Sequence, residues 1–143
     1  REKQQYSQSI TQRTVLARET SERGVSPSQE EKRTIVKQIA QAHGIDWKIL
    51  EAVWEVESGK SWDRSVTSYA GAQGPMQFLP STFRYYAPEG ANITSAHDSL
   101  NAGASLLSAA GASTGDVDSA LFAYNHSTAY VAKVKRIADS IQP

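Results

Sequence analysis

The sequence predicts a mainly helical domain, and three observations lead to that prediction. Apolar residues recur at helical spacing in several separate segments. Serine, aspartate or acidic residues stand before these segments, and glycines follow them, as is typical of helix ends. Any β-strand would be short and confined to about residues 64–79. A chain of 143 residues is the size of one domain and can bury a core without cross-links.

Composition excludes several classes of protein. Lys and Arg total 15 and Asp and Glu total 15, so the chain lacks the basic excess of a nucleic-acid-binding protein. No apolar run approaches the length of a transmembrane helix. Cysteine is absent, which excludes thiol catalysis, thiolate metal sites and disulfides. Because residue 1 is Arg, we expect a processed or excised fragment whose signal or anchor lies elsewhere.

Charge places the first boundary along the chain. Residues 1–33 hold 12 of the 30 charged residues and carry only a thin apolar stripe. A helix this polar is usually exposed or docked on a partner. We therefore interpret residues 1–29 as a polar N-terminal extension or spacer helix, and residues 30–143 as the main domain.

The first helices of the main domain have clear start and stop signals. Ser26 is the expected N-cap of the first helix, with Pro27 at its first helical position, and His43-Gly44 closes it. Asp46 is expected to cap the next helix, which runs to about Ser58.

The rest of the chain is expected to form loops and short helices around a cleft. Residues 65–115 contain only three charged residues and are rich in Gly, Ser, Ala and aromatic residues. Pro80-Ser81-Thr82 resembles a turn into another helix. Further helices are expected over about 98–110, 116–124 and 128–141.

The helix over residues 47–58 carries the most informative carboxylate. With Ile49 at zero on a helical wheel, Glu57 falls at about 80°, inside the apolar arc. Glu51 and Glu55 fall on the opposite, solvent-facing side. A carboxyl group that points into a core or cleft has a raised pKa, as the general acid of glycosidic cleavage requires. The alternative is that Glu57, near a helix end, swings out into water.

Neutral polar residues downstream offer sugar-binding chemistry. Gln77, Tyr124 and Asn125 supply the uncharged donors and acceptors that hold sugars and N-acetyl groups. Each of them alone is equally compatible with a surface or packing position.

Three ordered motifs carry a family resemblance. They are Glu57-Ser58, the segment from Ser68 to Pro80 (SYAGAQGPMQFLP), and Ala123-Tyr124-Asn125. Together they resemble the motifs of bacterial lytic transglycosylases, peptidoglycan-cleaving enzymes with a goose-lysozyme-like fold. Asn101-Ala102-Gly103 is also similar to the family pattern. The resemblance covers about residues 30–143.

The resemblance implies a role for each matching residue. Glu57 would be the single catalytic acid/base, and Ser68 would hydrogen-bond near it or to the substrate. The remaining substrate-binding roles would fall to Gln77 and Leu79 on the cleft floor, Tyr124 over the reacting centre, and Asn125 joining a helix end to the cleft. His126-Ser127 departs from the Ala-Gly that often follows Tyr-Asn in the family.

The resemblance also implies the reaction. Glu57 would protonate the glycosidic oxygen between N-acetylmuramic acid and N-acetylglucosamine. It would then take the proton of the muramyl C6 hydroxyl, which closes a 1,6-anhydro ring without water and without a cofactor. The expected location is extracytoplasmic: secreted, periplasmic or attached to the cell wall.

Two alternatives stay open at this point. A goose-type muramidase would share the fold and the glutamate but would use water. A non-catalytic peptidoglycan-binding module is the alternative from another class, with residues 1–29 docking on an envelope-complex partner.

Two other patterns are set aside. Gly111-Ala112-Ser113-Thr114-Gly115 matches a serine-hydrolase nucleophile elbow by letter, but helical segments flank it where that motif needs a strand and a helix. The three histidines share no metal-ligand spacing, so no metal is expected.

Overall fold

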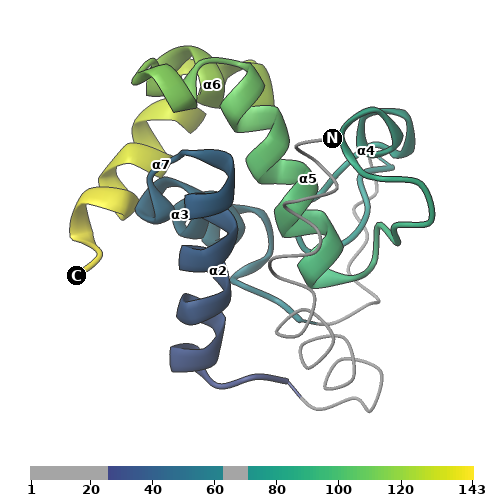
Figure 1. Cartoon of the computed structure of the whole chain (residues 1–143). Coiled ribbons are helices and arrows are strands. Elements are labelled where there is room, and N and C mark those ends of the chain that lie inside the picture. The colour runs from purple at the N-terminus through teal and green to yellow at the C-terminus, as the bar shows by residue number, and fades with distance from the viewer. Residues whose placement is uncertain (1–25, 63–70) are drawn as a thin grey trace.

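The computed structural model describes residues 26–62 and 71–143, which are almost entirely helical (Figure 1). The helices are α2 (Gln29–His43), α3 (Trp47–Ser58), α4 (Pro80–Tyr86), α5 (Ala96–Ala109), the 3-10 turn η1 (Ala112–Thr114), α6 (Val117–Tyr124) and α7 (Thr128–Ser140). Within the described ranges, β-structure is limited to one antiparallel bridge between Gln73 and Phe78. The predicted mainly helical fold class is confirmed.

The start of α2 differs from the sequence prediction. Its N-cap is Ser28, not Ser26, so the helix begins two residues after the expected first position, Pro27. The Ser28 hydroxyl accepts from the Glu31 N–H at 3.2 Å, and the Glu31 carboxylate accepts from the Ser28 N–H at 3.1 Å. This reciprocal capping box satisfies two of the helix-end donors.

The other helix ends follow from local capping. Asp46 accepts from the Lys48 N–H at 2.9 Å, as predicted, and Gly59 ends α3 in the left-handed conformation. Ser95 caps α5, which therefore begins slightly before the predicted residue 98. Pro80 is the first residue of α4, where its missing N–H costs nothing.

The core is built around α3. This helix packs against α2, α5 and α7, while α5 lies between the α2–α3 pair and α4 in Figure 1. Trp54 and Leu50 of α3, Leu107 of α5 and Val134 of α7 are completely buried. Because α3 contacts neighbours on several sides, its residues from Ile49 to Trp54 are buried within the bundle.

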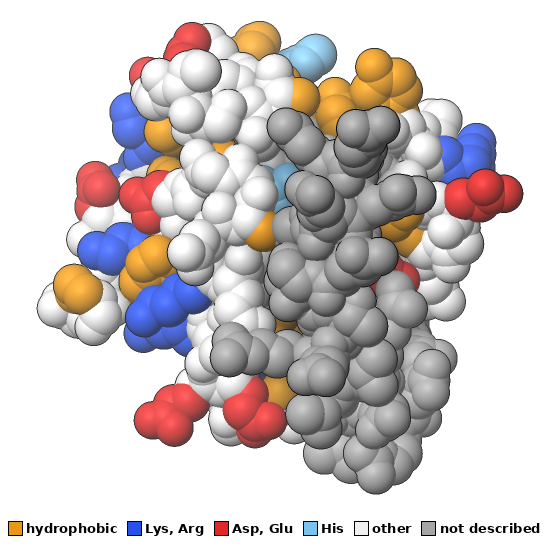
Figure 2. All heavy atoms as spheres, in the orientation of Figure 1, with side chains coloured by type: hydrophobic (Ala, Val, Ile, Leu, Met, Phe, Trp, Pro, Cys, Tyr) orange, Lys and Arg blue, Asp and Glu red, His pale blue; other side chains and the backbone are white. Residues whose placement is uncertain are grey.

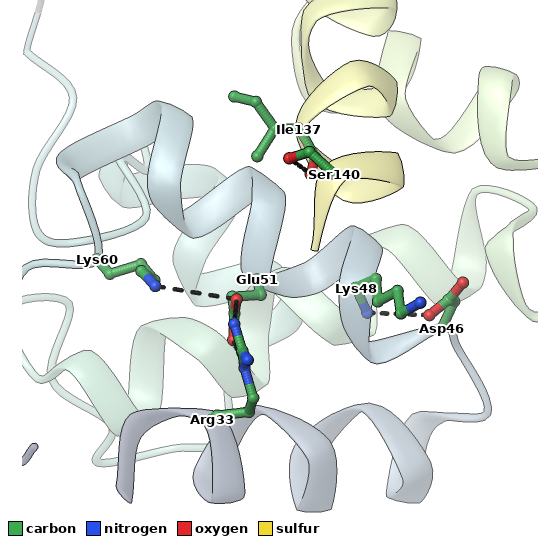
Figure 3. Close-up of polar contacts among 7 residues, drawn as sticks. All are labelled: Arg33, Asp46, Lys48, Glu51, Lys60, Ile137 and Ser140. Carbon is green, nitrogen blue, oxygen red and sulfur yellow. Dashed lines mark hydrogen bonds and ion pairs between the residues drawn. The ribbon is translucent and has the colours of Figure 1, made fainter. Parts of the chain in front are cut away.

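The solvent-facing position predicted for Glu51 is wrong. Its side chain is buried, with 2% of the residue exposed. Arg33 of α2 donates two hydrogen bonds to the Glu51 carboxylate, at 3.1 and 2.8 Å, and the Lys60 ammonium lies 3.9 Å away (Figure 3). The helical wheel placed Glu51 toward solvent because the periodicity of one helix contains no information about its neighbours. In the structure, α2 covers this face and supplies the cation Arg33. Glu55 is exposed, as predicted.

The face shown in Figure 2 has acidic and basic side chains mixed together, mostly on the side that carries α7 and α2. This mixture agrees with the formal net charge of zero. None of the helices in the described ranges is long and apolar enough to cross a membrane.

Candidate active site

Glu57 lies in the last turn of α3 and its carboxylate faces α7. The Tyr130 hydroxyl donates a hydrogen bond to Oε2 of Glu57 at 2.7 Å. Tyr130 is buried, with 8% of the residue exposed, and it stands in the first turn of α7. The contact joins two segments that are 73 residues apart in the chain.

Burial raises the pKa of Glu57 above its ordinary value, against smaller opposing effects of the Tyr130 hydrogen bond and the Lys133 charge. Desolvation disfavours the charged carboxylate, so Glu57 keeps its proton to a higher pH than a glutamate in water. Burial and the Glu57 charge also raise the pKa of Tyr130, so its hydroxyl stays protonated and acts as a permanent donor. The site therefore holds a carboxyl group that is protonated more readily than in water, beside a hydroxyl donor that orients it.

Tyr124, the last residue of α6, is the second phenol near Glu57. Its hydroxyl donates to the Met76 carbonyl at 2.7 Å. Its pKa is raised well above the ordinary value, by burial and then by the negative charge of Glu57. Gly103 of α5 makes room here, because a Cβ on it would lie 2.7 Å from the Met76 methyl group and 3.6 Å from the Tyr124 hydroxyl.

A tight hairpin carries Met76 to this point. Gln73 and Phe78 exchange two backbone hydrogen bonds, at 2.8 and 3.0 Å. Gly74 has a left-handed φ of 77°, and a Cβ on it would collide with the Ile93 carbonyl oxygen. The hairpin thus lies directly against the loop before α5, as only a glycine at this position allows.

Gln77 occupies a strained position in the same hairpin. Its φ is 53°, in the left-handed region of backbone conformations, which residues other than glycine, asparagine and aspartate rarely adopt. Both its backbone N–H and its side-chain amide donate to the Gly74 carbonyl, at 3.0 and 2.9 Å. These two bonds hold the residue in a conformation that is otherwise unfavourable, a feature common at functional sites.

The family comparison bears on the same residues. The model of the transglycosylase SLT domain family matches residues 34–142, a range that contains Glu57, Gln77, Tyr124 and Tyr130. The chain belongs to the transglycosylase SLT family. Searches of curated proteins and of solved structures found no match to it. The helical architecture agrees with the lysozyme-like fold of this family, and the family activity is directed at peptidoglycan, outside the cytoplasm.

Two further predicted site residues of the SLT domain, Leu79 and Asn125, lie at helix ends. Leu79 is the N-cap residue of α4 and is 51% exposed. Asn125 follows α6; its N–H donates to the Leu121 carbonyl and its own carbonyl accepts from the Ser127 N–H. Its side chain is exposed. Ser68, expected near the glutamate, lies outside the described residues.

Sequence reasoning assigned no role to Tyr130, although it makes the closest polar contact with Glu57 in the described part of the SLT domain. A signal existed: a buried phenol normally needs a hydrogen-bond partner, and Tyr130 lies three residues after the Ser127 cap on an amphipathic helix. Which partner it finds depends on how α7 packs against α3.

Proposed function

We propose that this SLT domain is a lytic transglycosylase that uses Glu57 as its single acid/base. It would cleave the β-1,4 bond between N-acetylmuramic acid and N-acetylglucosamine and leave 1,6-anhydro-muramyl ends. The observation that carries the proposal is the partly buried carboxyl group of Glu57, whose pKa is raised by desolvation and to which Tyr130 donates a hydrogen bond at 2.7 Å. A carboxyl that stays protonated and fixed is suited to act as a general acid.

In the first step, protonated Glu57 transfers its proton to the glycosidic oxygen as the bond to the anomeric carbon breaks. Since Tyr130 donates to Oε2, the transferable proton is best placed on Oε1. The N-acetylglucosamine side leaves as an alcohol. The acetamido group of the muramyl residue stabilises the positive charge that develops on the anomeric carbon.

In the second step, the Glu57 carboxylate takes the proton of the muramyl C6 hydroxyl. The C6 oxygen bonds to the anomeric carbon and closes the anhydro ring, so Glu57 regains its proton and no water is consumed. Throughout the cycle Tyr130 remains a donor, because its own pKa is raised far above the range in which enzymes work.

The carboxylate inventory supports a single acid. In the described ranges, the buried acids are Glu51 and Asp98, and Glu57 is partly buried. Glu51 is bonded to Arg33, and Asp98 accepts from the Asn92 N–H at 3.0 Å. Both are occupied by structural contacts, whereas a retaining or inverting glycosidase needs a second carboxylate across the scissile bond.

The substrate would be held mainly by uncharged groups. We assign Gln77 and Leu79 to the floor of the binding site, Tyr124 to the reacting centre and Asn125 to the end of α6 beside it. Ser68 is proposed to bond near Glu57 or to the glycan. Gln77 carries the strongest support of this set, because its strained backbone is held by two hydrogen bonds.

We further propose that residues 30–143 form the catalytic unit and that residues 1–29 form a spacer toward an envelope partner. If so, a chain that begins at residue 26, and so keeps the Ser28 cap of α2, should release the same fragments from purified peptidoglycan as the full chain. Loss of all activity on removing residues 1–25 would contradict this division.

Mass spectrometry of fragments released from purified peptidoglycan tests the proposed reaction. The full chain should release anhydro-muramyl products, each lighter by one water than a hydrolytic product. Glu57→Gln should lower the rate by about 100-fold to 10,000-fold, the usual contribution of a general acid. Glu55→Gln is the matched control, since Glu55 is exposed on the same helix.

The other outcomes separate the alternatives. Ordinary reducing ends would show a goose-type muramidase that uses water. Binding to peptidoglycan without any fragments, equal in the full chain and Glu57→Gln, would show a non-catalytic binding module.

A further inference from the structure

The chain reverses direction immediately after Glu57. Gly59 and Lys60 both adopt left-handed backbone conformations, with φ of 67° and 59°. The Gly59 N–H donates to the Glu55 carbonyl at 2.8 Å, and the Lys60 N–H donates to the Trp54 carbonyl at 3.3 Å. A glycine here is ordinary for a helix C-terminus, but a left-handed lysine is not. A strained backbone of this kind persists where surrounding contacts hold it.

Lys32 of α2 makes one such contact with the Lys60 backbone. Its ammonium group donates to the Lys60 carbonyl at 2.6 Å and lies 5.6 Å from the centre of the Trp54 ring. Only 8% of Lys32 is exposed, and burial together with the Lys60 charge lowers its pKa. Lysine is rarely this buried unless its charge is compensated, and here a carbonyl oxygen and an aromatic face compensate it.

Other contacts also hold the chain where it turns after α3. Arg33, next to Lys32 on α2, holds Glu51, and the Lys60 ammonium reaches the same carboxylate from the other side (Figure 3). The Trp54 indole N–H donates to the Ser61 carbonyl at 3.1 Å. Among these contacts, the Lys32 bond is the one that joins α2 directly to the strained backbone of Lys60.

We propose that Lys32 is a positioning residue for Glu57: by anchoring the Lys60 carbonyl to α2, it keeps the last turn of α3 from fraying. The inference rests on the proposed function of Glu57. Val56, Glu57 and Ser58 are only partly buried, so packing alone holds this turn less firmly than the rest of α3. Helix ends fray when their terminal groups lose partners.

Loss of this anchor has a predictable effect on Glu57. A frayed turn exposes the partly buried carboxylate further to water, and the pKa of Glu57 falls toward its ordinary value. The groups that face it are Tyr130 and Lys133 of α7 and Tyr124 of α6. Removal of a positive charge at Lys32 would by itself raise the pKa of a carboxyl group. The direction of the change thus separates loss of position from loss of charge.

The test compares Lys32→Met with Lys37→Met in the full chain. Methionine keeps most of the length of the side chain but cannot donate, and Lys37 is an exposed lysine on the same helix. With soluble glycan-strand fragments as substrate, we expect kcat of Lys32→Met to fall about 10-fold or more, with KM changed less than about twofold. The alkaline limb of its pH–rate profile should move to lower pH, while Lys37→Met keeps the original profile.

A second measurement does not depend on activity. Amide hydrogen exchange at Glu57 and Ser58 should be faster in Lys32→Met than in Lys37→Met, because the last turn of α3 opens more often. If the full chain releases no anhydro products but this difference is present, the proposed function fails and the anchoring by Lys32 stands.

The proposal is overturned if Lys32→Met matches Lys37→Met in kcat, pH profile and exchange, or if its alkaline limb moves to higher pH. Should Lys32→Met fail to fold, Lys32→Gln retains an N–H donor on a shorter, uncharged arm. For Lys32→Gln we expect kcat, the alkaline limb and the amide exchange to change in the same directions as in Lys32→Met, but by less.

Discussion

The Tyr130 hydroxyl lies 2.7 Å from Oε2 of Glu57 and donates to it from the first turn of α7. Burial and the Tyr130 bond act on the Glu57 carboxyl in opposite directions. Burial raises its pKa, and the hydrogen bond, which favours the charged form, lowers it. The balance of these two effects, with a smaller lowering by the Lys133 charge, sets the pH range in which Glu57 carries a proton.

Tyr130→Phe should move the alkaline limb of activity to higher pH. The substitution removes a contact that lowers the pKa of Glu57 and leaves the opposing effect of burial in place. It should also destabilise the fold by about 1–3 kcal/mol above the Glu57 pKa, where a buried carboxylate loses a donor. Activity against pH and urea unfolding measure the two effects. Tyr85→Phe, at a residue that is 80% exposed, is the control, and a limb that moves to lower pH would contradict the prediction.

Glu57→Gln should stabilise the protein at neutral pH and above. A carboxyl whose pKa is raised on folding costs stability as the pH rises from its ordinary pKa, 4.5, through its folded value. Glutamine removes this cost while it can still accept the Tyr130 hydrogen bond. The gain in unfolding free energy should be about 0.5–2 kcal/mol at high pH and should shrink below about pH 4.5. Equal differences at both pH values would refute the assignment.

Gly74→Ala should be much more destabilising than Gly115→Ala. Both glycines have left-handed φ angles, 77° and 91°, so both variants suffer the same kind of backbone strain. A Cβ at Gly74 additionally meets the Ile93 carbonyl, whereas no atom lies within 4 Å of one at Gly115. Thermal or urea unfolding should show an extra loss of about 1–3 kcal/mol for Gly74→Ala. Equal losses would mean that the hairpin can move away from the loop before α5.

Glu51→Ala should destabilise the fold more than Asp118→Ala does. Arg33–Glu51 and Lys135–Asp118 are both 2.8 Å ion pairs, but the Glu51 side chain is 3% exposed and the Asp118 side chain is 67% exposed. Removal of Asp118 should cost about 0–1 kcal/mol. Removal of Glu51 leaves Arg33 and Lys60 without their shared partner and opens space in the core. Because Arg33 is partly exposed, the loss of unfolding free energy should be about 2–4 kcal/mol, somewhat less than for a fully buried pair. Urea unfolding at neutral pH compares them, and similar losses would contradict the role given to burial.

Helix boundaries were predictable where the deciding contacts are local. The Asp46 cap, the end of α3 at Ser58 and the helix start at Pro80 depend on residues within about one turn, and the structure confirms all three. The start of α2 was misplaced although its signal is local too. Ser28 with Glu31 three residues later forms a capping box, which outweighs the preference of Pro27 for a first helical position.

Burial of the glutamates shows where local pattern stops being informative. The helical wheel correctly predicted that Glu57 points inward, because its own helix supplies the apolar arc. It wrongly predicted that Glu51 points outward. The cations that make burial of Glu51 possible are Arg33, 18 residues earlier, and Lys60, just past the end of the helix.

The sequence by itself determined the helices, most of their caps and the glutamate that points inward, since each depends on residues within a few positions. It also carried the ordered motifs of the SLT family. Only the tertiary structure decided that Tyr130 donates to Glu57, that Tyr124 reaches Met76, and that Lys32 anchors the backbone after α3. Each of these contacts joins residues 28 to 73 positions apart, and their distances follow from how the helices pack, which no local periodicity records.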